Sequence, residues 1–214
     1  MGKKQNYLIW DLDIISSNRK KQMKYILWIF LISYPSITMA DIQSDVENIL
    51  RTEYPSDYEI SLHKFELPEE VKSQAEKQVQ QKFFKSYIFL WNICHGDSLA
   101  GYAVLDNTYG KSLPITFLVI FSPVGKILRT DIIRYREPYG GAIASRRWLD
   151  QFIDKSVKDD FRVDQNIDSI SGATISVKSV TKAIYKLTYI IERIIFDDSF
   201  NCNKKPNRAK SNAK

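Results

Sequence analysis

The stretch that decides the fold is "SYIFLWNICHGDSLAGYAVLDNTYGKSLPITFLVIFSPVGKILRTDIIRYRE", Ser86 to Glu137. It contains short runs rich in Ile, Phe, Tyr and Val, at 86–93, 99–106, 114–122 and 127–137. The runs are separated by "CHGDS", "NTYGKS" and "SPVGK", which have the composition of turns. Consecutive strands joined by such short turns pair with their neighbours in an antiparallel arrangement. The sequence therefore predicts an antiparallel meander or half-barrel.

Helical patterns lie on both sides of these strands. Before them, an amphipathic helix is expected from Ile42 to Glu53, and a mostly polar helix opens at Pro68. After them, residues 142–156 predict a helix, and a last helix runs from Thr174 to about Ile195. The fold class is thus α+β: a twisted antiparallel sheet or half-barrel flanked by helices, in a single domain. The expected buried stripe of the last helix consists of Val177, Val180, Ile184, Leu187, Ile191 and Ile194, and the helix before it has Ile143, Trp148, Leu149 and Phe152 on one side.

The two ends of the chain differ from the middle. Residues 19–40, "RKKQMKYILWIFLISYPSITMA", have a basic start, a short apolar stretch and a small-residue ending. This is the layout of a signal peptide covering 1–40 and cleaved after Ala40, and Met23 is a candidate for the true start. The alternative is a buried N-terminal helix. At the other end, residues 197–214 are rich in Lys and Asn and are expected to form a disordered basic tail.

Charge and residue counts exclude several classes of function. The net charge is +6, and six Lys and Arg against two Asp in residues 1–40 account for +4 of it. The rest of the chain therefore lacks the basic stripe that a nucleic-acid-binding protein needs. His63 and His95 are the two histidines, which excludes a His-rich metal site and argues against a His-dependent hydrolase. Cys94 and Cys202 could form one disulfide, and the sequence leaves their pairing open.

The start of the last helix has the features of an anion site. It is preceded by "DSISGAT", Asp168 to Thr174. Unpaired backbone N–H groups and the helix dipole favour a negative group there. Gly172 and Ala173 let another molecule approach the main chain, and Ser171 can cap the helix. The alternative is an ordinary serine cap with a glycine turn.

The same string resembles the flavinylation motif D-x-x-[ST]-G-A-T of the FMN-binding domain family. That family includes flavin subunits of the sodium-translocating NADH:quinone oxidoreductase and of Rnf-type complexes. The resemblance implies that Thr174 is esterified to the phosphate of FMN, and that Asp168, Ser171, Gly172 and Ala173 complete the recognised motif. It also implies maturation by a separate flavin transferase that uses FAD and magnesium. The FMN-binding domain is then expected at 86–196, with 41–85 as its N-terminal helical part.

A second segment supports the resemblance. "REPYGGAIASRRWLDQF", residues 136–152, is similar to the family's loop of the type E-T-P-G-x-G followed by a helix with a tryptophan. The chain departs from the pattern because no threonine stands between Glu137 and Pro138, because Tyr139 replaces a frequent leucine, and because Val177 stands where many relatives have a serine. The residues that match are Glu137, Pro138, Gly140, Gly141 and Trp148.

These residues have chemical roles consistent with a flavin. The glycines allow backbone N–H groups to approach a flat ring. Tyr139 or Trp148 could flank the ring, although core packing is the alternative for Trp148. Lys178, one turn after Thr174, could neutralise the phosphate or be an ordinary exposed lysine. A group of arginines could dock an acidic partner or only solvate the surface: Arg134, Arg136, Arg146 and Arg147.

The resemblance, taken with the signal-peptide layout of residues 1–40, predicts an exported flavoprotein that carries electrons through FMN attached to Thr174. Its place would be the periplasm or the extracytoplasmic face of the inner membrane. Its partners would be a membrane electron-transfer complex or a periplasmic redox protein. This is the expectation for an electron-transfer protein rather than a stand-alone enzyme. The alternatives are a small FMN-dependent reductase of a soluble acceptor, and a non-redox interaction module whose flavin site has decayed.

Overall fold

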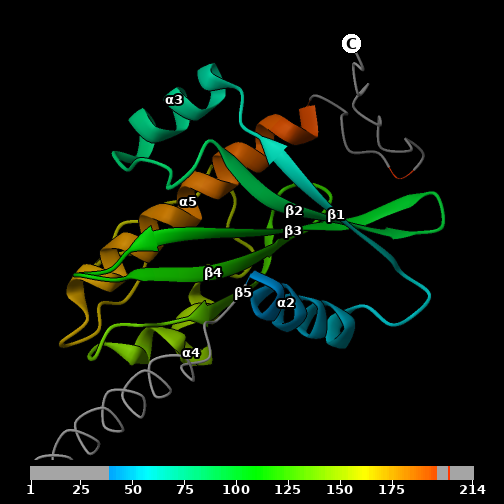
Figure 1. The fold of residues 1–214 in the computed structure, drawn as a ribbon. Coiled ribbons are helices and arrows are strands. Elements are labelled where there is room, and N and C mark those ends of the chain that lie inside the picture. The colour runs from blue at the N-terminus through cyan, green and yellow to red at the C-terminus, as the bar shows by residue number, and fades with distance from the viewer. Residues whose placement is uncertain (1–38, 197–201, 203–214) are drawn as a thin grey trace, which may run out of the picture. The chain divides into compact units, whose positions relative to one another are not determined.

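A computed structural model describes residues 39–196 and Cys202, and the part from Gln43 onward forms one compact unit (Figure 1). The strands are β1 (Glu59–Glu66), β2 (Tyr87–His95), β3 (Ser98–Tyr109), β4 (Pro114–Phe121) and β5 (Ile127–Arg134). The α-helices are α2 (Met39–Glu53), α3 (Glu69–Val79), α4 (Arg146–Leu149) and α5 (Thr174–Phe196). Two 3-10 helices, η1 (Gly141–Ala144) and η2 (Asp150–Phe152), flank α4.

The strands form one antiparallel sheet in the order β1-β2-β3-β4-β5, which is a meander (Figure 1). This confirms the predicted class and the four predicted strands, β2 to β5. β1 is an addition, because residues 59–66 were not predicted as a strand. Its side chains are alternately exposed and half-buried, and its sequence "EISLHKFE" carries charges throughout, so its apolar signal is weak.

The core lies between the sheet and α5. Side chains from one face of the central strands, such as Val104, Phe117 and Val119, pack in one cluster with the apolar stripe of the helix. All six predicted stripe residues of α5 are buried, as the period of 3.6 residues indicated. The helix α3 packs against α5, and α2 lies beside β5 through ion pairs of Asp45 with Arg134 and Glu53 with Arg129.

The single helix predicted for residues 142–156 is wrong. The segment is broken into η1, α4 and η2, because Ser145 adopts an extended conformation with ψ of 137° and Ile153 does so again with ψ of 142°. The apolar side was predicted correctly, since Ile143, Trp148 and Phe152 are all buried.

A disulfide joins Cys94 at the end of β2 to Cys202, with 5.9 Å between the two Cα atoms. It settles the pairing that the sequence left open.

The two ends of the chain were expected to be a signal peptide (1–40, with Met23) and a disordered tail (197–214). Both lie outside the described residues, except that Met39 and Ala40 begin α2 and that Cys202 is described. In the described part of the chain, no helix combines the length and the apolarity needed to cross a bilayer.

Candidate functional site

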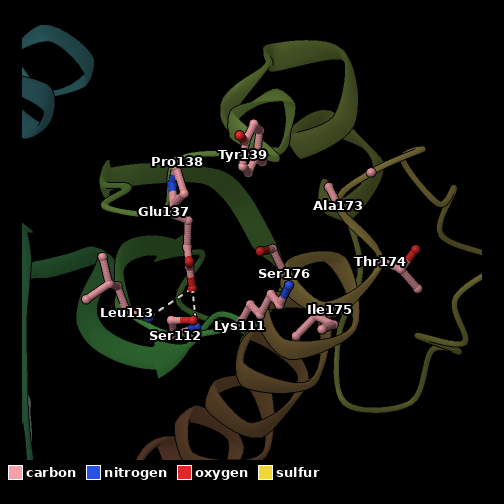
Figure 2. A pocket seen from close by; sticks show the side chains of 11 residues that line it. Lys111, Ser112, Leu113, Glu137, Pro138, Tyr139, Ala173, Thr174, Ile175 and Ser176 are labelled. Carbon is pink, nitrogen blue, oxygen red and sulfur yellow. Dashed lines mark hydrogen bonds between the residues drawn. The ribbon is translucent and has the colours of Figure 1, made fainter.

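A pocket of about 710 Å³ lies where three segments distant in the sequence meet (Figure 2). The β3–β4 turn provides Lys111–Leu113, the segment after β5 provides Glu137–Tyr139, and the start of α5 provides 172–176. The structure thus brings the two motifs of the sequence together and adds a third wall. The turn was predicted only as a connection between strands.

The start of α5 presents Thr174 at the pocket. Thr174 is the first residue of the helix, is exposed, and lines the pocket. Gly172 has φ of +77°, a conformation that favours glycine, and a Cβ built there meets nothing within 4 Å. The main chain before the helix is therefore open to another molecule, whereas Ala173 is buried. In Figure 2, Glu137 and Thr174 lie toward opposite ends of the pocket, with Ser176 between them.

Glu137 is committed to the β3–β4 turn. Its Oε1 accepts hydrogen bonds from the backbone N–H groups of Ser112 at 2.5 Å and Leu113 at 2.9 Å (Figure 2). These two bonds lower the pKa of Glu137, so the carboxylate stays ionised. A Cβ at Gly110 would lie 2.6 Å from the same Oε1, which explains the glycine at that position. The carboxylate therefore holds the segment after β5 against the β3–β4 turn, so that two walls of the pocket are joined.

Gly140 brings the two motifs into contact. Gly140 has φ of +86°, and a Cβ there would lie 3.1 Å from the Cβ of Ala173. Gly141 starts η1. Neither glycine lines the pocket; Gly140 is closely packed, whereas a Cβ at Gly141 would meet only Cδ1 of Tyr135, at 3.9 Å. Tyr139 does line it, and 82% of its surface is exposed.

Trp148 and Asp168 lie outside the pocket lining. Trp148 is 3% exposed, meets the ring of Phe152 edge-on at 5.2 Å, and donates from Nε1 to the carbonyl of Asp168 at 2.8 Å. The N–H of Asp168 donates to Oε1 of Gln151 at 2.8 Å. Core packing is thus the role of Trp148, which also fixes the backbone that leads to Gly172. Asp168 and Ser171 are exposed, and neither lines the pocket.

Two lysines lie near the start of α5, and they differ in their relation to the pocket. Lys111 was missed at the level of the sequence, where it counted only as turn composition; among the residues that line the pocket it is the one basic side chain. Figure 2 shows it extending from the turn toward the first turn of α5. Lys178 is exposed and lies outside the lining.

Three of the four grouped arginines have intramolecular partners. Arg134 pairs with Asp45, and Arg146 pairs with Asp131 and Asp150 at 2.8 Å each. Arg136 donates to the carbonyl of Pro114 at 3.1 Å and to Thr116 Oγ1 at 3.2 Å. These contacts favour a structural role for the three.

The geometry agrees with what comparison with known proteins finds. Residues 110–188 match the model of the FMN-binding domain family. The chain is also 35% identical over 97 residues to a Clostridium ljungdahlii protein whose name makes it a subunit of a proton-translocating ferredoxin:NAD(+) oxidoreductase complex. That match covers 42% of this chain and 52% of the relative, so the chain spans about half the relative's length. The region matched by the family model begins at the turn that carries Lys111 and includes all the residues that line the pocket. Residues 110–188, which hold the whole pocket, are therefore similar to the FMN-binding domain family.

Proposed function

We propose that the chain is an exported flavoprotein that carries electrons through FMN attached by a phosphoester to Thr174. The observation that carries this proposal is the position of Thr174. Thr174 is exposed, is the first residue of α5, and lines a pocket within the region that matches the FMN-binding domain family. A hydroxyl at that place can be esterified without unfolding the helix.

The residues present fit FMN. The pocket volume lies within the range of roughly 300–1,000 Å³ typical of small-molecule sites. The first backbone N–H groups of a helix lack intrahelical partners and favour a phosphate. Lys111 adds a positive charge to the same pocket, and Gly172 leaves the approach to the main chain open.

Electron transfer is the chemistry that FMN supplies when it is bound, since it accepts one or two electrons. The chain itself holds and orients the cofactor. The similar protein of Clostridium ljungdahlii is named as part of an oxidoreductase complex. We infer that this chain also takes part in electron transfer, with a membrane electron-transfer complex or a periplasmic redox protein as its donor and acceptor.

Export is supported by two observations. Residues 1–40 have the layout of a signal peptide. Disulfides such as Cys94–Cys202 persist in oxidising compartments and are rare in the cytosol. A covalent tether suits the extracytoplasmic side, because a lost flavin is not replaced there. A flavin transferase on that side would attach it.

The test is the intact mass and the in-gel flavin fluorescence of denatured protein, exported with and without a co-expressed flavin transferase. We expect the mass of one FMN minus water only with the transferase. Thr174→Ala should abolish it, and Ser176→Ala, which removes a second hydroxyl from the same pocket, should retain it. Fragmentation of the tryptic peptide 163–178 should place the added mass on Thr174. An unmodified wild-type chain, or modification that survives in Thr174→Ala, would overturn the proposed attachment.

A further inference from the structure

Tyr135 joins two walls of the pocket without lining it. It follows β5 directly and is half-buried. Its hydroxyl donates to the backbone carbonyl of Tyr139 at 2.5 Å and lies 3.2 Å from Oγ of Ser176. Tyr139 and Ser176 both line the pocket, and they come from segments that are 37 residues apart in the sequence. One hydroxyl therefore connects them.

The direction of these hydrogen bonds is fixed by chemistry. A carbonyl oxygen can only accept, so the single phenolic hydrogen of Tyr135 goes to Tyr139. The contact with Ser176 is then a bond in which the serine donates and the tyrosine accepts. With its hydrogen committed in this way, the hydroxyl of Ser176 can act toward the pocket only as an acceptor.

The packing around Gly140 reinforces this connection. A Cβ at Gly140 would lie 2.6 Å from the hydroxyl oxygen of Tyr135 and 3.1 Å from the Cβ of Ala173. The hydroxyl, the loop 137–141 and the residue before α5 thus share one contact that leaves no room for a larger residue. This close packing holds the loop against the helix start.

We propose that Tyr135 is a positioning residue for FMN: its hydroxyl fixes the loop 137–141 against the first turn of α5 and orients the hydroxyl of Ser176. The inference rests on the proposed function, since it takes FMN as the occupant of the pocket. A pocket that is ordered before binding loses less entropy when the cofactor enters. Removing the hydroxyl should therefore weaken FMN binding and loosen the loop, while the core stays intact.

The test compares Tyr135→Phe with the wild type, using the full chain produced without a flavin transferase. Titration with FMN, followed by flavin fluorescence, should show a dissociation constant raised about 3- to 10-fold, as expected for one lost hydrogen bond. Without FMN, the backbone amides of the loop 137–141 should exchange with deuterium faster in the variant. Tyr189→Phe is the matched control. Its hydroxyl, on α5, also donates one hydrogen bond and accepts another: it donates to Oε1 of Gln74 in α3 at 3.1 Å and accepts from Arg193 at 3.2 Å. It lies about 20 Å along the helix from Ser176, and it should change neither property.

A second variant pair separates positioning from general damage. Gly140→Ala should weaken FMN binding, because its Cβ meets the Tyr135 hydroxyl and because φ is positive there. In a Tyr135→Phe background the same change should cost less, since the oxygen at 2.6 Å is gone. Additive effects, or unchanged affinity and exchange in Tyr135→Phe, would overturn the positioning role alone. A wild-type chain that takes up no FMN would overturn the proposed function and this inference together.

Discussion

At the scale of single residues, the sequence located the motifs but not the direction of every side chain. Thr174, Glu137, Pro138 and Tyr139 all line the pocket, and their contact with FMN stays a prediction. The carboxylate of Glu137, however, binds the amides of a turn that lies 24 and 25 residues earlier. Such a contact depends on how distant segments pack, which no local pattern encodes. The same packing explains why Lys111 was missed.

Lys111 and Lys178 make a matched pair for testing the phosphate end of the pocket. Lys111→Gln should weaken the binding of FMN to the flavin-free chain by about 10- to 100-fold, because a hydrogen bond to a charged group contributes roughly 1.5–3 kcal/mol. Lys178→Gln should have little effect, since Lys178 is exposed outside the lining. Both affinities can be measured by fluorescence titration.

Riboflavin, which lacks the phosphate, provides the control ligand. Its affinity should be the same for Lys111→Gln and the wild type, and added salt should reduce the difference for FMN. An equal loss for FMN and riboflavin would show that Lys111 contacts the ring or shapes the pocket rather than meeting the phosphate.

At the scale of elements, the periodic signals succeeded and the irregular ones failed. The apolar stripe of α5 was predicted residue by residue. β1 was missed because the charged side chains of this edge strand weaken its apolar pattern. The helix at 142–156 was predicted too long because the backbone becomes extended at Ser145. Lys186 is the sharpest case: it is a lysine with 0% exposure on a helix that the pattern described only by its apolar residues.

The burial of Lys186 is explained by its partners. Its ammonium lies 3.8 Å from Oδ2 of Asp106 in β3, donates to the carbonyl of Lys82 at 3.1 Å, and lies 3.8 Å from the centre of the Phe83 ring. Burial raises the pKa of Asp106 from 3.8 to about 6, although the attraction of Lys186 opposes the rise. Burial also lowers the pKa of Lys186. For both groups, the cost of losing water exceeds the gain from pairing.

The raised pKa of Asp106 makes stability depend on pH. The folded protein binds this proton more tightly than the unfolded chain, so the contribution is full below pH 3.8 and is lost as the pH rises through about 6. The loss amounts to about 3 kcal/mol. Lys186→Met removes the attraction that holds the pKa of Asp106 down, so the loss should extend to a higher pH.

Urea unfolding of the flavin-free chain between pH 4 and pH 8 measures this shift. Lys182→Met, which removes an exposed lysine from the same helix, should leave the pH profile of the wild type unchanged. If Lys186→Met also keeps that profile, the ion pair does not set the pKa of Asp106.

At the scale of the whole molecule, the disulfide and the flavin pocket lie at opposite ends of the sheet. Cys94 pairs with Leu99 near the start of β3, and the pocket begins at Lys111, just after β3 ends. A strand of 12 residues separates them, which corresponds to about 35–40 Å. Stability from the bridge and function at the pocket should therefore be separable. The sequence could not predict this arrangement, because the pairing of two cysteines depends on whether the fold brings them together.

The double variant Cys94→Ala/Cys202→Ala tests that separation. The bridge joins residues 108 positions apart and encloses β3, β4, β5 and α5. Its loss should lower the free energy of unfolding by about 2–5 kcal/mol, mainly because the unfolded chain regains freedom. FMN affinity and attachment to Thr174 should be retained at temperatures where the variant is folded. Wild-type protein treated with a reductant should lose the same stability, and the variant should be insensitive to it. Equal stability with and without reductant in the wild type would mean that the cysteines are unpaired in solution, and the disulfide would then cease to support export.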